Sequence, residues 1–290
     1  MYERHFGLTV KPFAMTPDPA FLYPSRQHAM ALTMLEYGLE SQAAFTLLTG
    51  EIGSGKTTLV RSLLRRLGDQ VVVGVVSNAH GRFTSIQRWA LSALGVTAAG
   101  DSDVAVYEAL ARQVTFEFDR GRRTLLIFDE AQNLSIDVLE ELRLLSNLNA
   151  DGALMLQILL VGQPELREKL SQPQLRQFAQ RVSVDYQLQA LSRAETRAYI
   201  EHRLQVAGRS RPLFQAEAVE FIFARTKGVP RLVNMLCDYA LVYAYAEQQS
   251  SIPVELVAQI VRDRRSGQAM ATVVESHVPT SLGVESGGSA

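Results

Sequence analysis

One segment of the sequence has the composition and spacing of a loop that holds a phosphate chain. It reads Gly50-Glu51-Ile52-Gly53-Ser54-Gly55-Lys56-Thr57, a complete match to the pattern G-x-x-x-x-G-K-[ST]. The glycines let the backbone bend so that successive N–H groups point at phosphate, and a following helix adds a favourable dipole. We expect Lys56 to reach the β and γ phosphates of a nucleotide, the Thr57 hydroxyl to ligate Mg²⁺, and binding to extend to Thr58.

Two adjacent carboxylates follow an apolar run further along the chain. The run Leu125-Leu126-Ile127-Phe128 is followed by Asp129 and Glu130. Four apolar residues predict a buried strand, and ligands of open α/β sheets bind at the carboxyl ends of strands. We expect Asp129 to hold Mg²⁺ through water, and Glu130 to act as general base on the water that attacks the γ-phosphate. The second carboxylate favours hydrolysis over transfer to a small acceptor.

Polar residues at the ends of two other apolar runs are candidates for sensing the nucleotide. Gln163 follows Val161-Gly162, and its amide would contact the γ-phosphate or the attacking water. Asn78 follows a run of valines and would hold Glu130 inactive until a partner binds. An ordinary polar residue in a loop or turn is an equally good interpretation of each.

Three arginines are candidates for contacting phosphate from outside the loop. Arg176 and Arg181 precede the run Val182–Leu188, and either would serve as an arginine finger for a neighbouring subunit, a role that contributes ~10³–10⁵ in rate. A surface salt bridge is the alternative for both, and we favour Arg181 as the finger. Arg231 follows Pro230, which is typical of a helix start, and would bring that helix onto the nucleotide.

The elements that must position these residues alternate between strand and helix. The sequence predicts strands at residues 44–49, 71–77, 124–128, 154–161 and 182–188, with helices at 26–40, 56–67 and 136–149 among them. This alternation specifies an α/β fold, a parallel sheet with helices on both faces. The capping box Ser192-Arg193-Ala194-Glu195 then opens a purely helical stretch, with further helices at 216–226, 230–247 and 253–264.

Four regions follow from this pattern. We expect an N-terminal arm and helix packed on the core (1–42), a nucleotide-binding core (43–190), a small all-helical lid domain (191–265) and a disordered tail (266–290). The tail assignment rests on its Ser, Gly and small residues.

The composition of the whole chain excludes several classes of protein. The chain has 290 residues, 47% hydrophobic and 20% charged, which is typical of a soluble globular protein, and its net charge of -1 gives no strong attraction to polyanions. The single cysteine, Cys237, allows no internal disulfide and is expected to be a small buried hydrophobe. The segment MYERHFGLTV lacks the apolar core of a signal peptide, and no apolar run approaches the ~18 residues of a membrane helix. We therefore expect a cytoplasmic protein.

Strings beyond the phosphate loop make the chain resemble the ExeA-type, general secretion pathway A family of AAA+ ATPases. They are HFGLTVKPFAMTPDPAFLYPSRQH, LLTGEIGSGKTTL, LLIFDEAQNLS, LEELRLLSN, ILLVGQPELR, LRQFAQRV and GVPRLVNMLCDYALV, within residues 1–265. The resemblance implies a P-loop NTPase fold of the AAA+ type, ATP and Mg²⁺ as ligands, and hydrolysis between subunits of a nucleotide-dependent ring or filament. It implies that Gln163 is sensor 1, Arg231 is sensor 2, Arg181 or Arg176 is the finger, and Phe21 to Tyr23 help wall the adenine pocket.

The resemblance also indicates partners. Long family members continue into a transmembrane helix and a periplasmic peptidoglycan-binding domain, of which this sequence shows neither, so it is similar to short relatives from envelope polysaccharide and protein-sorting systems. We expect a membrane-embedded export or assembly component as partner, recruitment by it to the inner membrane, and no direct peptidoglycan binding.

Two other functions stay open at the level of the sequence. The core also resembles transposition regulators of the TniB type, which makes DNA the alternative partner, although the net charge of -1 disfavours it. A scaffold that binds ATP but barely hydrolyses it is disfavoured by the intact Lys56, Asp129 and Glu130.

Overall fold

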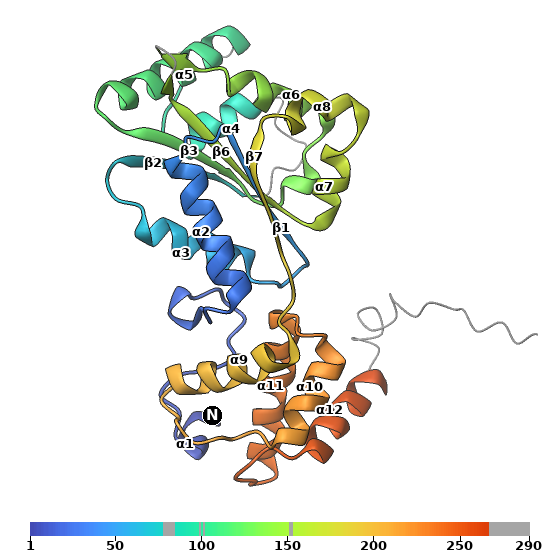
Figure 1. The fold of residues 1–290 in the computed structure, drawn as a ribbon. Coiled ribbons are helices and arrows are strands. Elements are labelled where there is room, and N and C mark those ends of the chain that lie inside the picture. Colours follow the sequence, from blue (N-terminus) through green and yellow to red (C-terminus); the bar gives the residue numbers. More distant parts are fainter. Residues whose placement is uncertain (78–84, 99, 101, 151–152, 267–290) are drawn as a thin grey trace, which may run out of the picture.

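A five-stranded parallel sheet forms the centre of the larger of two parts of the molecule (Figure 1). The structure, a computed structural model, describes residues 1–77, 85–98, 100, 102–150 and 153–266. The strands lie in the order β2-β3-β6-β1-β7, and each neighbouring pair is parallel. Their bounds are β1 (Phe45–Gly50), β2 (Val71–Val76), β3 (Arg123–Phe128), β6 (Leu156–Gly162) and β7 (Val182–Leu188). The predicted sheet is confirmed.

The burial of the strands follows their place in the sheet. Every residue of β1 and β6 is buried, because these inner strands are covered on both faces. The edge strand β7 alternates instead, with Val184 and Leu188 buried and Asp185 exposed. Since β3, β6 and β1 are neighbours and run in the same direction, the segments that follow their carboxyl ends come together at one edge of the sheet.

Helices cover both faces of the sheet. One face carries α2 and α3, whose Leu35 and Leu59 share an apolar cluster with β1, β3 and β6. The other carries α4 to α8, which share a larger cluster with the same strands. Their bounds are α2 (Arg26–Glu40), α3 (Lys56–Arg66), α4 (Ile86–Ala93), α5 (Asp103–Asp119), α6 (Ile136–Leu145), α7 (Pro164–Leu170) and α8 (Arg176–Ala179). Short 3₁₀ turns η2 (Ala131–Asn133) and η3 (Pro173–Leu175) and a small hairpin of β4 (Asn149–Ala150) and β5 (Ala153–Leu154) join them.

The smaller part, after β7, is a helical region with one isolated β-bridge, between Phe214 and Ile252, among its described residues. It begins with the predicted capping box, in which Ser192 Oγ accepts from the Glu195 N–H and the Glu195 carboxylate accepts from the Ser192 N–H. Its apolar cluster includes Cys237, which is fully buried as predicted. The helices are α9 (Arg193–Val206), α10 (Ala216–Thr226), α11 (Pro230–Ala246) and α12 (Val254–Ser266).

The N-terminal arm corrects one prediction. We expected residues 1–42 to pack on the core, but only the later part does so: α2 lies on the sheet, and the Pro17 carbonyl accepts from Arg61 Nη1 of α3 at 2.6 Å. Residues of the first turns, Tyr2, Phe6, Leu8 and Phe13, are buried in the apolar cluster of the helical region. Figure 1 accordingly shows α1 (Glu3–Phe6) beside the helices of that region. The arm therefore runs from the helical region to the sheet, where α2 begins.

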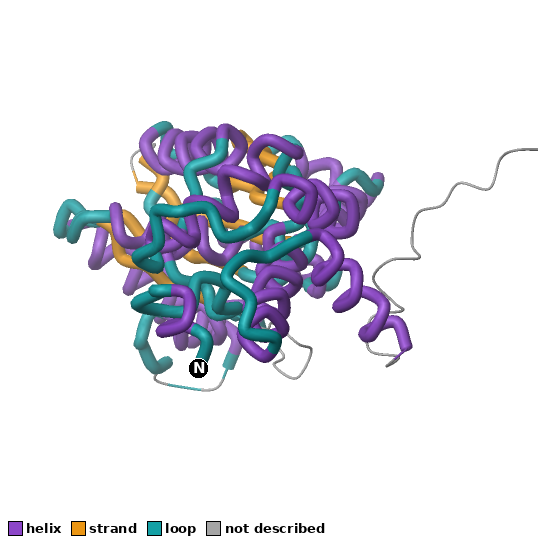
Figure 2. Tube along the Cα trace, turned by 90° about the horizontal axis from the view of Figure 1, so that it is seen from below, coloured by secondary structure: helices purple, strands orange, loops and turns teal. Residues whose placement is uncertain are grey.

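Other element boundaries differ from the predictions in small ways. Helix α6 ends at Leu145 rather than at 149, because Ser146 turns the chain and its hydroxyl donates to the Arg143 carbonyl at 2.7 Å. The predicted tail has only Ser266 within the described residues, where it ends α12; residues 267–290 lie outside them. None of the described helices is long and apolar enough to cross a bilayer. In the view of Figure 2, helices and loops surround the strands.

Candidate nucleotide-binding site

The glycine-rich segment forms the loop that its sequence predicts. It joins the end of β1 at Gly50 to the start of α3 at Lys56. Gly53 and Gly55 have φ angles of +79° and +106°, a region that residues with a side chain rarely adopt. Within the described part of the chain, no side chain caps the N-terminus of α3, so its first N–H groups are available to an anion.

The carbonyl groups of the loop are engaged inside the protein. Lys56 Nζ donates to the Gly50 and Glu51 carbonyls at 2.6 and 3.0 Å. The Gly53 carbonyl accepts from the Arg231 N–H at 3.1 Å, and the Ser54 carbonyl lies 3.1 Å from His28 Nε2. With these four acceptors already paired, a ligand would be held mainly by N–H donors of the loop, which suits phosphate.

Lys56 is a buried cation near two carboxylates. Its side chain is only 7% exposed. Burial lowers the pKa of Lys56, and the negative charges of Glu130 and Asp129 oppose that shift. In a site of low polarity these charges act on one another more strongly than in water.

The predicted carboxylates stand directly after β3. Asp129 Oδ1 accepts from the Glu130 N–H at 2.9 Å, and burial raises the pKa of Asp129 above its usual value. Glu130 has a φ angle of +54°. Such a left-handed conformation costs an L-residue about 1–2 kcal/mol, so the fold holds Glu130 at a sharp turn between β3 and η2.

A glutamine that the sequence analysis missed joins Glu130 to Gln163. Gln132 Nε2 donates to Glu130 Oε2 at 2.6 Å, and Gln132 Oε1 accepts from the Gln163 N–H at 3.1 Å. Gln163 Nε2 also donates to Glu130 Oε2 at 3.3 Å. The proximity of Glu130 and Gln163 follows from the adjacency of β3 and β6. Gln132 was visible in the sequence only as a polar residue two places after Glu130.

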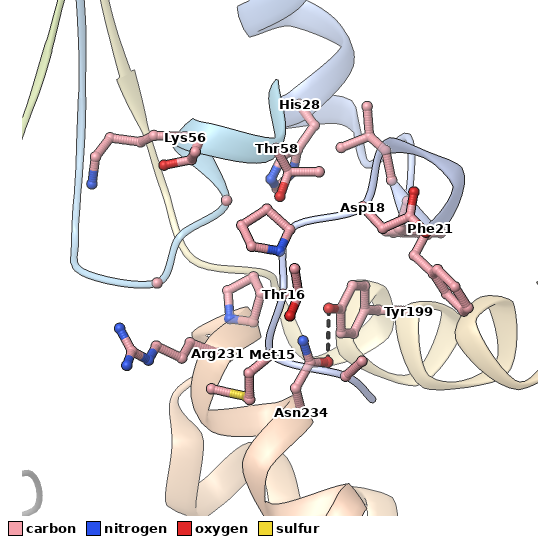
Figure 3. Close-up of a pocket in the computed structure, with 18 of the residues that line it drawn as sticks. Met15, Thr16, Asp18, Phe21, His28, Lys56, Thr58, Tyr199, Arg231 and Asn234 are labelled. Carbon is pink, nitrogen blue, oxygen red and sulfur yellow. Dashed lines mark hydrogen bonds between the residues drawn. The ribbon is translucent and has the colours of Figure 1, made fainter. Parts of the chain in front are cut away.

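One pocket of about 360 Å³ brings these segments together. Most of its lining comes from the loop and start of α3, the arm from Ala14 to Tyr23, and the faces of α9 and α11 nearest to them, and His28, Glu130 and Gln163 complete it. Figure 3 shows the arm lying between the phosphate loop and the helical region. Of the predicted nucleotide and catalytic residues, those that line the pocket are Ile52, Gly53, Gly55, Lys56, Thr57, Thr58, Glu130, Gln163 and Arg231. Gly50, Glu51, Ser54 and Asp129 belong to the same segments but do not line it.

The helical region reaches the loop through Arg231. Besides the hydrogen bond from its N–H, its Cβ lies so close to Gly53 that an added Cβ there would stand 2.3 Å away. Gly53 is therefore required both by its φ angle and by the close approach of α11.

Residues of the N-terminal arm, which is separate from the phosphate loop in the sequence, line a second end of the pocket. Phe21, Leu22 and Tyr23 line it, as the resemblance implied for a pocket wall. Arg203 of α9, only 6% exposed, fixes the arm by donating to the carbonyls of Pro12 and Ala14 and by lying 4.8 Å from the Phe21 ring centre. Tyr199 OH donates to Asn234 Oδ1 at 2.8 Å between α9 and α11 (Figure 3).

His28 is a further pocket residue that the sequence did not single out. Its Nδ1 lies 2.7 Å from Ser25 Oγ and its Nε2 3.1 Å from the Ser54 carbonyl. It thus ties α2 to the phosphate loop. Burial is the main cause that lowers the pKa of His28.

The two candidate finger residues lie elsewhere. Arg181 Nη1 donates to Ser146 Oγ at 2.7 Å and to the Arg143 carbonyl at 3.2 Å, so its guanidinium holds the end of α6. Arg176 is exposed at the start of α8 and bonds to no other described side chain. Neither lines the pocket of its own chain. Asn78 lies outside the described residues.

Comparisons with known proteins agree with this geometry. Residues 39–170 match the model of an AAA domain. General secretion pathway protein A of Aeromonas hydrophila is 39% identical over 257 residues, which cover 87% of this chain and 46% of that protein. The chain thus spans less than half the length of that relative.

Solved structures share the fold. The ORC2 protein of Aeropyrum pernix, solved as ADPNP and ADP complexes, is similar with a TM-score of 0.65 and 21% identity, over 87% of this chain and 71% of that one. The ORC1 protein of the same organism, solved in complex with DNA, gives a TM-score of 0.62 and 21% identity, over 89% and 71% of the two chains. With the AAA domain and the 39% identity above, the chain belongs to the AAA P-loop ATPases of the general secretion pathway protein A type.

Proposed function

We propose that this chain binds ATP with Mg²⁺ in the pocket and hydrolyses it to ADP and phosphate. The observation that carries the proposal is that a phosphate loop, its lysine and the carboxylate of Glu130 line one pocket. The adenine end would be walled by the arm between Ala14 and Tyr23, and the triphosphate would lie along the N–H groups of the loop.

The metal ligands expected from the sequence suit Mg²⁺. Thr57 and Asp129 offer oxygen atoms, which Mg²⁺ prefers, and Mg²⁺ in nucleotide sites takes few protein ligands beside phosphate. Asp129 Oδ1 accepts from the Glu130 N–H, which leaves Oδ2 without a hydrogen bond from any described residue. When bound, Mg²⁺ supplies positive charge against the phosphate oxygens.

The chain's own residues would carry the remaining chemistry. The water oxygen forms a bond to the γ-phosphorus while the bond to the bridging oxygen breaks; the water proton passes to Glu130, and ADP leaves. Lys56 stabilises negative charge on the β and γ phosphates, for which it exchanges its two carbonyl partners. Gln163 stands beside Glu130, within reach of the same water.

Replacing the proposed base tests this function. Glu130→Gln should bind ATP with near-normal affinity but release phosphate at least ~10²-fold more slowly, since a general base contributes about that much. Phosphate release with Mg·ATP measures the rate and calorimetry the affinity. Glu168→Gln, the same change at an exposed carboxylate of α7, is the matched control and should keep the wild-type rate. A wild-type rate in Glu130→Gln would exclude Glu130 as the base.

The process served is proposed from the relative of 39% identity. We propose a subunit of a self-assembling ATPase that drives or switches an envelope secretion or export system, acting from the cytoplasmic side with a membrane-embedded partner. Cells lacking the protein should then lose delivery of an exported protein or polysaccharide, and wild type but not Glu130→Gln should restore it. Several-fold stimulation of hydrolysis by duplex DNA, weakening steeply with salt, would instead support action on DNA.

A further inference from the structure

Gln132 uses both ends of its side-chain amide at the proposed catalytic site. Its nitrogen donates to Glu130 Oε2 at 2.6 Å and its oxygen accepts from the Gln163 N–H at 3.1 Å. One side chain therefore joins a residue that follows β3 to the residue that follows β6. Among natural side chains, a carboxamide is the group that donates and accepts at once in this planar arrangement.

The backbone that carries Gln132 is itself fixed. Lys169 Nζ, from α7, donates to the carbonyls of Gln132 and Leu134, the latter at 2.7 Å. Helix α7 starts directly after Gln163. The 3₁₀ turn η2 is thus tied to α7 twice, by the Gln132 side chain at the residue before α7 and by Lys169 at the Gln132 carbonyl. These two contacts leave the Gln132 amide little freedom to rotate.

These contacts make the two carboxylate oxygens of Glu130 different from one another. Oε2 accepts from two amides, those of Gln132 and Gln163. Oε1 accepts from no described residue, and Glu130 lines the pocket. The carboxylate is therefore held by one oxygen and offers the other.

We propose that Gln132 is a positioning residue for hydrolysis, which holds Glu130 Oε2 and the Gln163 backbone so that Oε1 takes the proton from the attacking water. This inference rests on the proposed function of Glu130 as base. Gln132 acts through Glu130 and touches neither nucleotide nor water itself. It should therefore affect turnover rather than the affinity for ATP.

Two variants and one control separate this role from a structural one. Gln132→Ala removes both contacts, and the isosteric Gln132→Glu keeps an acceptor for the Gln163 N–H while losing the donor to Glu130. Both should lower kcat at least ~10-fold and change KM for Mg·ATP less than ~3-fold, as expected for a group that acts only on the chemical step. Asn133→Ala, which removes an exposed amide from the same turn, should keep the wild-type kcat.

A double variant gives the readout that a structural defect would not produce. In Glu130→Gln, measured as single turnovers over hours, adding Gln132→Ala should lower the residual rate less than ~2-fold, because its target is already lost. Equal losses in both backgrounds would overturn the inference, as would a kcat within 2-fold of wild type in both Gln132 variants. A slow Glu130→Gln beside fast Gln132 variants refutes only this inference, whereas a wild-type rate in Glu130→Gln refutes the proposed base as well.

Discussion

Single residues of the site are held mainly by hydrogen bonds to the backbone of the phosphate loop. Lys56, His28 and the N–H of Arg231 engage carbonyls of Gly50, Glu51, Gly53 and Ser54. Because these contacts come from α3, α2 and α11, three separate elements fix the direction of the loop. The glycines permit its shape, and these neighbours select it.

His28 gives the loop a dependence on pH. Burial lowers its pKa in the folded protein, with the charge of Glu195 acting in the opposite direction, whereas in the unfolded chain it is near ~6.5. Below that pH the unfolded state binds more protons, so folding stability falls as pH drops, by about 1.4 kcal/mol for each unit of pKa depression. Above the pKa of the unfolded state, His28 is neutral in both states, and this loss of stability is absent.

Thermal unfolding checks this prediction. His28→Gln loses hydrogen bonds at all pH values but removes the titration. The difference in Tm between wild type and His28→Gln should therefore be larger at pH 7.5 than at pH 5.5. Parallel curves across that range would show that His28 does not titrate between the folded and unfolded states as proposed.

At the scale of elements, β3, β6 and β1 bring the chemistry together and α7 extends from it. Helix α7 starts directly after Gln163, contacts η2 through Lys169, and contacts β7 through Arg167, which donates to Gln187 Oε1 at 2.6 Å. The segment that follows carries Arg176. A displacement of Gln163 would thus be transmitted through α7 to the segment that carries the exposed Arg176.

The contacts of the two candidate arginines predict different defects. Arg176→Ala should leave ATP binding nearly intact and remove most hydrolysis, because its free guanidinium would act on a neighbour's γ-phosphate. Arg181→Ala should lower the free energy of unfolding by about 1–3 kcal/mol through the loss of its bonds at the end of α6. Phosphate release and thermal unfolding of both variants measure this. A fully active Arg176→Ala beside an inactive but stable Arg181→Ala would assign the finger to Arg181 instead.

The sequence predicted the elements that depend on local pattern and missed those that depend on distant contacts. The five strands, the loop and the capping box at Ser192 follow from apolar runs and fixed motifs. The roles of Gln132 and His28 depend on partners far along the chain, Gln163 and Ser54, as well as on near ones. The arm was misplaced for the same reason, since Tyr2 and Phe6 meet the helical region only in the folded protein.

At the scale of the whole molecule, the nucleotide pocket lies where the two parts meet and the arm crosses between them. Arm, loop and helical region all contribute to its lining. A bound nucleotide would therefore contact both parts at once and bias their arrangement, which is how an ATPase cycle would be conveyed to a partner.

The proposed assembly would use Arg176, which does not line its own chain's pocket, to complete the site of a neighbouring chain. If a neighbour completes the site, activity per subunit should rise with protein concentration. Mixing Arg176→Ala with Lys56→Ala should restore turnover above the sum of the two alone, because each chain supplies what the other lacks. A mixture no more active than its parts would argue against a shared site.

The central claim, that this pocket binds ATP through its phosphate loop, is tested most directly by calorimetric titration of wild type and Lys56→Ala with Mg·ATP. Wild type should bind one ATP per chain, and Lys56→Ala should show no measurable binding while unfolding at a temperature near that of wild type. Lys11→Ala, which removes an exposed lysine outside the pocket, should bind as wild type does. Near-normal affinity in Lys56→Ala would contradict the assignment of the loop and, with it, the proposed function.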